Sequence, residues 1–131
     1  MPPIAKKNDR IVGMDTHIVM VPTPAGQVPT PMPLPFAGPI TESLASSVFV
    51  DGVPVVVRGS EANNQPAHIA PGGQFMNTPQ DKARVVAASS SVFANDVPIA
   101  RIGDAATSCD DMGADQNAHI VPAGAHTCSA D

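Results

Sequence analysis

Aromatic residues are scarce in this chain, which has no tryptophan, no tyrosine and only four phenylalanines among 131 residues. Valine, isoleucine, alanine, leucine and methionine must therefore fill the core, and each of these side chains buries a modest apolar area. Domains of this size with so thin a core usually gain stability from a metal, from disulfides or from a partner chain. The sequence thus predicts a fold that depends on more than apolar packing.

Long helices and long apolar runs are also missing. The 15 prolines and 10 glycines interrupt almost every window in which a long helix could form. No window approaches the roughly 18 apolar residues of a transmembrane segment, so we expect no stable insertion into a membrane. The first residues, MPPIAKKNDRIVG, lack the apolar stretch of a secretory signal. We therefore expect the protein to be made and assembled in the cytoplasm.

Basic residues are few. Seven lysines and arginines stand against 12 acidic residues, which gives a net charge of −5. Nothing in this distribution predicts a positive face for a phosphate backbone. Nucleic acid is therefore not an expected partner.

Cysteine occurs only twice, at Cys109 and Cys128. Because no export signal precedes them, the reducing compartment argues against a disulfide between the two. We expect independent thiols, one of which ligates a metal.

Two segments repeat without gaps at a separation of 44 residues, SVFVDGVP at 47–54 and SVFANDVP at 91–98. Each pattern is typical of a β-hairpin, with a β-branched and aromatic strand, a two-residue turn and a second strand. The turns are Asp51-Gly52 and Asn95-Asp96. Asp-Gly favours a type I′ turn, which needs positive φ at both central positions. The sequence therefore predicts hairpins in an all-β fold.

An arginine and a glycine follow each hairpin, as Arg58-Gly59 in one copy and as Arg101-Ile102-Gly103-Asp104 in the other. The segment 9–15, DRIVGMD, resembles a third copy that lacks its hairpin. We therefore expect one domain, 1–131, made of three repeats at roughly 4–39, 40–77 and 78–128.

Residues 22–39, PTPAGQVPTPMPLPFAGP, are rich in closely spaced prolines. Proline cannot donate a hydrogen bond to a β-ladder and favours an extended polyproline-like path. We therefore interpret this segment as a surface strap that lies over the apolar side of the domain.

Three of the four histidines occupy similar settings. His17, His68 and His119 each precede an isoleucine and, a few residues later, a proline, and they are separated by 51 residues each. If three copies of a motif surround a common axis, these side chains converge on it. Three buried imidazoles without a cation would leave nitrogen atoms unsatisfied, which is costly. A divalent metal would remove that cost.

Zinc is the metal that we expect for histidines and one thiolate, with iron as the second choice. Cys109 is the expected fourth ligand because it follows Gly103-Asp104 in the loop that leads to His119. His126 and Cys128 are the alternatives. A structural zinc site can contribute roughly 10 kcal/mol of folding free energy, which is more than a thin core supplies.

The units VFVDGVPVVVRG and VFANDVPIARIGD, with GMDTHIVMVPTPAG near the start, resemble the PAAR family, which is named for Pro-Ala-Ala-Arg. The signature is clearest at Pro98-Ile99-Ala100-Arg101, which Gly103 and Asp104 follow. In the second copy it has changed to PVVVR at 54–58. The resemblance covers roughly residues 4–128.

Proteins of that family sharpen the tip of the trimeric spike in type VI secretion systems and related contractile injection machines. The resemblance implies a small conical β-fold with little helix, a pseudo-threefold base and a zinc near the vertex. It carries the metal role onto His17, His68, His119 and Cys109. Two features depart from the shortest members: the long proline-rich segment after His17 and the competing ligands in His126-Thr127-Cys128.

The expected function is thus that of a non-enzymatic cap. One copy would cover the strand ends of a trimeric spike, because unpaired sheet edges must be covered. It would help to pierce the target membrane, could carry effector cargo, and would leave the cell or enter the target cell on firing.

Two alternatives stay open at this point. A small zinc hydrolase could use a three-histidine site with a bound water, although no acidic residue recurs beside the histidines and Cys109 would close the open position. A proline-rich interaction module could instead use residues 22–39 to recruit partners.

Overall fold

Every regular element of the computed structural model is a β-strand, which confirms the predicted all-β fold for the residues that it describes. Those residues are 2–113, 115–124 and 128–130. The strands are β1 (Arg10–Thr23), β2 (Gly26–Glu42), β3 (Phe49–Val50), β4 (Val53–Pro54), β5 (Glu61–Asn63), β6 (Gln74–Phe75), β7 (Lys82–Val85), β8 (Phe93–Ala94), β9 (Val97–Pro98), β10 (Ala105–Thr107) and β11 (Ala118–Val121).

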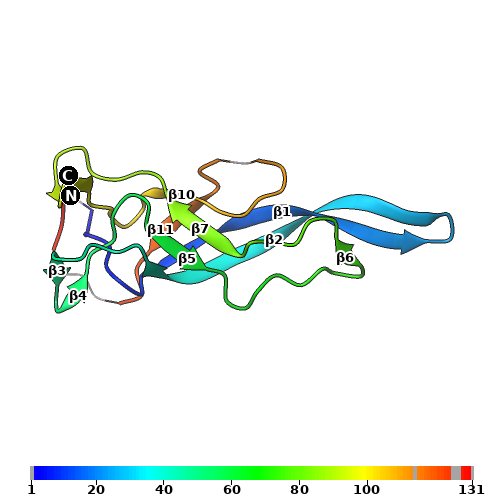
Figure 1. Cartoon of the computed structure of the whole chain (residues 1–131), viewed down its shortest axis with the longest axis horizontal. Helices are drawn as coiled ribbons and strands as arrows, with labels where there is room; N and C mark the ends of the chain where they lie inside the picture. Colours follow the sequence, from blue (N-terminus) through cyan, green and yellow to red (C-terminus); the bar gives the residue numbers. More distant parts are fainter. Residues whose placement is uncertain (1, 114, 125–127, 131) are drawn as a thin grey trace.

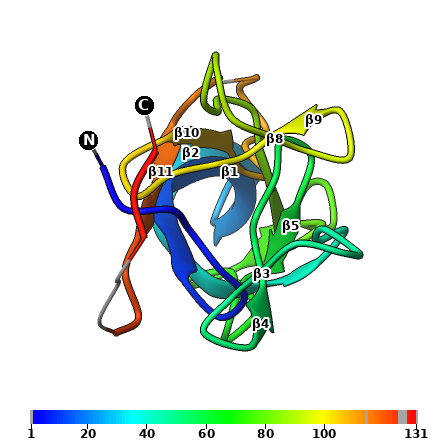
Figure 2. The same cartoon turned by 90° about the vertical axis from the view of Figure 1, so that its left-hand side faces the viewer.

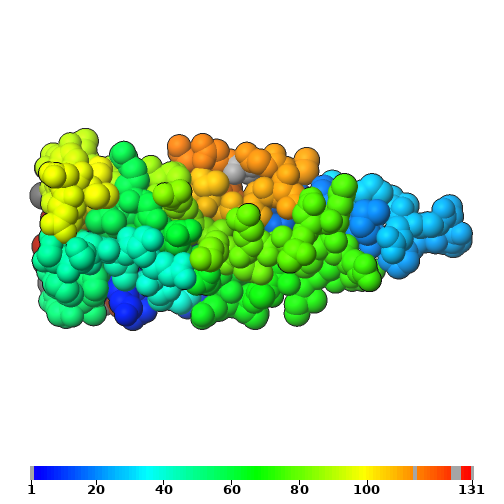
Figure 3. Space-filling model, in the orientation of Figure 1, coloured from blue at the N-terminus to red at the C-terminus, as the bar shows by residue number. Residues whose placement is uncertain are grey.

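Seven of these strands form one antiparallel sheet in the order β11-β10-β7-β5-β2-β1-β6, and an additional pairing of β11 with β1 closes it into a ring. The hairpins β3–β4 and β8–β9 stand apart from this sheet. Figure 1 shows an elongated molecule whose blunt end carries both hairpins and both termini, whereas the β1–β2 turn forms the narrow end. Figure 3 shows the same taper with side chains included. We call these ends the base and the tip.

Both predicted hairpins are present, since β3 pairs with β4 and β8 pairs with β9. The φ angles are 53° at Asp51, 80° at Gly52, 51° at Asn95 and 68° at Asp96. Positive φ at both central positions of each turn is what a type I′ turn requires. The two hairpins predicted from the local sequence are therefore confirmed.

Three short segments form a hydrogen-bonded ring near the base, where the chain crosses the molecule (Figure 2). The Ala5 N–H donates to the Ala100 carbonyl, the Ala100 N–H donates to the Val56 carbonyl, and the Val56 N–H donates to the Ala5 carbonyl, at 2.9–3.0 Å. All three residues are fully buried. This cycle has pseudo-threefold symmetry and defines which residues of the three repeats are equivalent.

The ring places three copies of one motif, at 3–9, 54–60 and 98–104. In each copy the side-chain oxygen of the last residue accepts the N–H of the residue three positions earlier. The pairs are Asp9 with Lys6 at 2.8 Å, Ser60 with Val57 at 3.0 Å and Asp104 with Arg101 at 2.8 Å. Each copy therefore ends in the same side-chain-closed turn.

The first copy thus lies at 3–9, PIAKKND being the counterpart of PIARIGD, and not at 9–15 as the sequence suggested. Asn8 has a φ of 76° where Gly59 and Gly103 have 93°. Asparagine is one of the few residues other than glycine that adopts this left-handed conformation. The substitution of glycine by asparagine hid the likeness.

Two apolar clusters follow the same symmetry. The cluster near the base includes Ile4, Val55 and Ile99, which are equivalent residues of the three repeats. The cluster above it includes the equivalent residues Ala5, Val56 and Ala100, with larger side chains packed around them, such as Ile11, Phe36, Ile40, Val85 and Ile120. Apart from Phe36, both clusters are aliphatic, as the scarcity of aromatic residues predicts.

The structure corrects the interpretation of residues 22–39. They do not form a polyproline-like strap, because β2 pairs with β1 from Pro39, opposite Arg10, to Gly26, opposite Thr23. Four prolines in β2 alternate with other residues, and all four are exposed: Pro29, Pro31, Pro33 and Pro35.

The alternation explains why a strand tolerates these prolines. Thr16 and Ile18 lie opposite Pro33 and Pro31. Their N–H groups point away from β2, donating instead to the Asp110 and Asp111 carboxylates. Such non-hydrogen-bonded pairs need no N–H from the proline. Prolines with a period of two therefore leave the ladder intact, and this period is the signal that the sequence interpretation missed.

The tip is an uncharged ribbon. No aspartate, glutamate, lysine or arginine lies between Asp15 and Glu42 in the sequence. β6 pairs with Val19 and Met20 of β1, and beyond that point the described chain adds no third strand to the ribbon. Among the residues that the structure describes, no helix has the length and apolar character to cross a membrane.

Candidate metal centre

Strand β1 presents two polar side chains to the interior. Asp15 and His17 are two residues apart, so both side chains point to the same face of the strand, and both are fully buried. Burying a carboxylate costs free energy unless it is paired and hydrogen-bonded. Groups from other segments must therefore satisfy these two side chains.

The loop that follows β10 is bound to β1 by two aspartates. Their carboxylates accept backbone N–H groups of β1 that would otherwise pair with a neighbouring strand. The Asp110 carboxylate accepts the Thr16 N–H at 2.7 Å, and the Asp111 carboxylate accepts the Ile18 N–H at 3.0 Å. The Asp111 N–H in turn donates to the Thr16 carbonyl at 2.9 Å. These bonds hold Cys109 against Asp15 and His17.

His68 comes from the loop between β5 and β6. Its backbone N–H donates to Asp81 at 2.9 Å, which fixes the loop, and its ring lies 4.8 Å from the ring of His17 between centroids. The side chain is 3 % exposed. Three separate segments therefore converge on this place.

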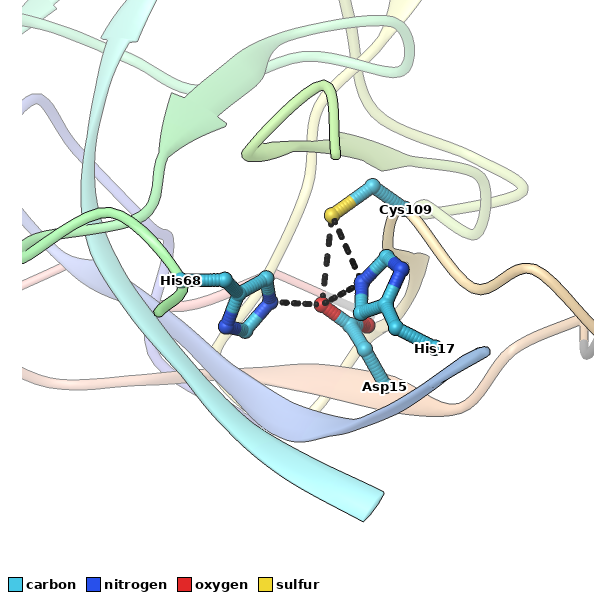
Figure 4. Close-up of side chains that lie close together, drawn as sticks. All are labelled: Asp15, His17, His68 and Cys109. Atoms are coloured by element: carbon cyan, nitrogen blue, oxygen red, sulfur yellow. Dashed lines mark hydrogen bonds and ion pairs between the residues drawn. The ribbon is translucent and has the colours of Figure 1, made fainter. Parts of the chain in front are cut away.

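The four side chains offer ligand atoms that all lie within 4.8 Å of one another. Asp15 Oδ2 is central, at 2.7 Å from His68 Nε2, 3.2 Å from Cys109 Sγ and 3.8 Å from His17 Nε2 (Figure 4). Cys109 Sγ lies 3.7 Å from His17 Nε2. A tetrahedral zinc with the usual bond lengths spaces its ligand atoms about 3.3–3.8 Å apart. Of the four pairs of ligand atoms described above, His68–Asp15 is clearly shorter than this range and would have to separate on metal binding.

His17 also has an orphaned nitrogen. Its buried Nδ1 makes no hydrogen bond with any group that the structure describes, although Asp111 Oδ1 lies 3.1 Å away. The angle at this contact is unsuitable for a hydrogen bond. A metal-bound histidine typically donates its second N–H to a carboxylate. Rotation of the His17 ring to align Nδ1–H with Asp111 would give that arrangement and would keep Nε2 toward the cluster.

Asn64 sets the tautomer of His68. Its Oδ1 accepts the Ala37 N–H at 3.0 Å, which turns its Nδ2 toward His68 Nδ1 at 3.1 Å. Nδ1 must therefore accept, so the network assigns the proton to Nε2, which donates it to Asp15. A metal on Nε2 would require the proton on Nδ1 and a reversed Asn64 amide. Metal binding would thus displace protons from both His68 Nε2 and Cys109.

Burial raises the pKa of the Cys109 thiol to about 12, and the hydrogen bond to Asp15 and the charge of Asp15 add to this effect. Because the thiolate is the reactive form, we expect Cys109 to be slow toward iodoacetamide at pH 8 after chelation. The exposed Cys128 should react on the order of a hundredfold faster. Mass spectrometry of the alkylated peptides measures both rates, with urea-unfolded protein as the control. Equal rates in the folded protein would contradict the expectation.

A polar cavity of about 350 Å³ opens beside the cluster. Residues 77–80 line one side and residues 108–111, which include Cys109 and Asp111, line the other. The cavity offers an ion a path to the thiol. A metal site needs such an entry path, and this observation adds to the fit of the donor set.

The structure brings together three of the residues singled out in the sequence, His17, His68 and Cys109, and it adds Asp15. It does not bring His119 to them, because His119 is exposed on β11 opposite Val12 and Ala105. Cys128 is exposed at the base, where its carbonyl accepts the Ile4 N–H. His126 lies outside the described residues.

The register of the repeats explains the position of His119. Twelve residues after Ala5 and Val56 lie His17 and His68, but twelve residues after Ala100 lies Met112. His17 and His68 are therefore equivalent, whereas His119 lies on a returning strand. The sequence Asp-Thr-His at 15–17 indicates Asp15 as a further ligand, because alternate residues of a strand share a face and Asp15 therefore lies beside His17.

A comparison with protein families agrees with this architecture. The model of the PAAR motif family matches residues 35–112, which is more than half of the chain and includes His68, Cys109 and the motif at 98–104. No curated protein matches the sequence. With three copies of the motif joined in a ring and a family match of this extent, the chain belongs to the PAAR motif family.

Proposed function

We propose that this protein is the non-enzymatic cap of a trimeric spike. PAAR proteins are structural tip proteins of secretion-system spikes. The observation that carries the proposal for this chain is the ring of three equivalent motif copies near the base. One chain with three equivalent sides can meet three identical chains, so one copy suffices for one trimer.

We propose further that Asp15, His17, His68 and Cys109 hold a structural metal ion. Two imidazoles, a thiolate and a carboxylate suit zinc best and iron second. A bound ion would cross-link β1 to the loops that carry His68 and Cys109. Four protein ligands leave no position for a reactive water, which favours a structural site over a hydrolytic one.

The tip supports a role in piercing a membrane. A charged side chain at the centre of a bilayer costs about 2.5–3.5 kcal/mol on insertion scales, and the ribbon between Asp15 and Glu42 carries none. On the free edge of β2 four successive positions whose N–H would point outward, 29, 31, 33 and 35, are prolines, which have no N–H. The ribbon therefore has few donors that would go unsatisfied in lipid.

Metal analysis tests the structural site. We expect elemental analysis of the purified protein to give about one zinc per chain, because the four ligands form a single closed site. Protein that carries no transition metal after expression in zinc-supplemented medium would rule the site out.

Co-expression with the cognate trimeric spike tests the cap. Native mass spectrometry should find one copy per spike trimer, since three sides of one chain engage three protomers. Absence of a complex, or a ratio of three copies per trimer, would contradict the proposal.

A further inference from the structure

The base has three corners, and one of them is built differently (Figure 2). The hairpins β3–β4 and β8–β9 form two corners, whereas segments from opposite ends of the chain form the third, where Pro3 pairs with Ser129. One hydrogen bond recurs in all three corners. The Val55 N–H donates to the Val48 carbonyl, the Ile99 N–H to the Val92 carbonyl and the Ile4 N–H to the Cys128 carbonyl.

This recurrence identifies the equivalent outer residues, which come directly after the acceptors. They are Phe49, Phe93 and Ser129, and each lies opposite the proline that begins a motif copy. Ala94 and Ala130 come next in the chain and are both buried in the cluster near the base, which supports the alignment. Two corners therefore carry a phenyl ring and the third carries a hydroxyl.

The two phenyl rings are unusually exposed. Phe49 is 54 % exposed and Phe93 is 53 % exposed. Half of the four phenylalanines in a chain so poor in aromatics thus lie at equivalent surface positions. Exposed aromatic side chains in a defined arrangement mark interaction surfaces and frequently dominate binding.

Resting on the proposed cap function, we infer that Phe49 and Phe93 anchor the base in two of three identical pockets of a threefold-symmetric partner. The corner at Ser129 fills the third pocket weakly. The hydrogen-bonded ring holds the corners at pseudo-threefold positions, which matches the symmetry of a trimer end. A second copy of this chain would offer unequal corners in return and thus fits the arrangement poorly.

Alanine substitution at each corner tests the anchors. Phe49→Ala and Phe93→Ala should each weaken binding to the cognate spike trimer about tenfold or more, measured by biolayer interferometry. Met112→Ala removes an apolar side chain outside the base that is slightly more exposed, at 62 %, and should leave the affinity unchanged. Thermal unfolding of each variant checks that the fold is retained.

Moving a phenyl ring from one corner to another gives the sharper test. Because the three pockets of a trimer are identical, Phe49→Ala combined with Ser129→Phe again presents two rings, and the affinity should return to within about threefold of the natural protein. Failure of this rescue in a folded variant would overturn the inference, as would full binding by the Phe49→Ala, Phe93→Ala variant. If the natural protein does not bind the trimer, the cap function itself fails. A phenylalanine-dependent dimer of the isolated protein would instead point to a second copy as the occupant.

Discussion

Replacing His17 with alanine is expected to abolish zinc binding and to lower the midpoint of thermal unfolding by roughly 10–20 °C. The substitution removes a proposed ligand whose side chain is fully buried, and it leaves the Asp15 carboxylate with one neighbour fewer. In a core without tryptophan or tyrosine, we expect apolar packing not to replace the cross-link that the proposed metal would form between β1 and two loops. Elemental analysis and scanning calorimetry measure the two effects.

His119→Ala is the matched control, because it removes the same side chain from an exposed position on β11. It should retain the metal and shift the midpoint by no more than a few degrees. A chelator should lower the midpoint of the natural protein toward that of His17→Ala and leave His17→Ala unchanged. Loss of the metal in His119→Ala with retention in His17→Ala would show that the ligands differ from those proposed.

Gly38→Ala is expected to destabilise the protein by about 3 kcal/mol or more. A Cβ on Gly38 would lie 1.8 Å from the Asn63 carbonyl oxygen and 2.6 Å from its carbon, so β2 and β5 would have to separate. Asn64 follows directly and contacts His68, so the disturbance should reach the metal centre. Urea denaturation measures the change in the free energy of unfolding.

Gly124→Ala serves as the comparison, because a Cβ there meets no heavy atom within 4 Å. It should change the free energy of unfolding by less than about 0.5 kcal/mol. Equal stability of the two variants would mean that β2 and β5 do not approach each other as closely as described.

The parts of the fold that could be predicted from the sequence are those encoded locally. The turns at Asp51-Gly52 and Asn95-Asp96 need only their own φ angles, and both hairpins follow from them. The first motif copy was displaced in the sequence interpretation because Asn8 replaces a glycine whose role is conformational. Comparison of residue types alone does not show that Asn8 is equivalent to Gly59 and Gly103, because what these residues share is a left-handed backbone conformation.

The pairing of the long strand β2 could not be predicted for a different reason. Proline is unfavourable in most strands, and the sequence alone does not say on which side of β2 a partner lies. Only the pairing with β1 shows that Pro31 and Pro33 occupy non-hydrogen-bonded positions. Prediction of the ligand cluster met a similar limit. The sequence pointed to His17, His68 and Cys109, but it also included His119, which lies exposed on β11, and it missed Asp15, which lies in the cluster.

The corner that joins Pro3 to Ser129 has a consequence for the order of folding. The other two corners close over a few residues, but this one requires contact between residues 4 and 128. Contacts of such long sequence separation carry a large entropic cost of loop closure and form late in folding. A partner that binds the base holds these two segments together and so stabilises, by mass action, the corner that they form. Docking and the last step of folding would then reinforce each other, so that the cap becomes most rigid once it is in place.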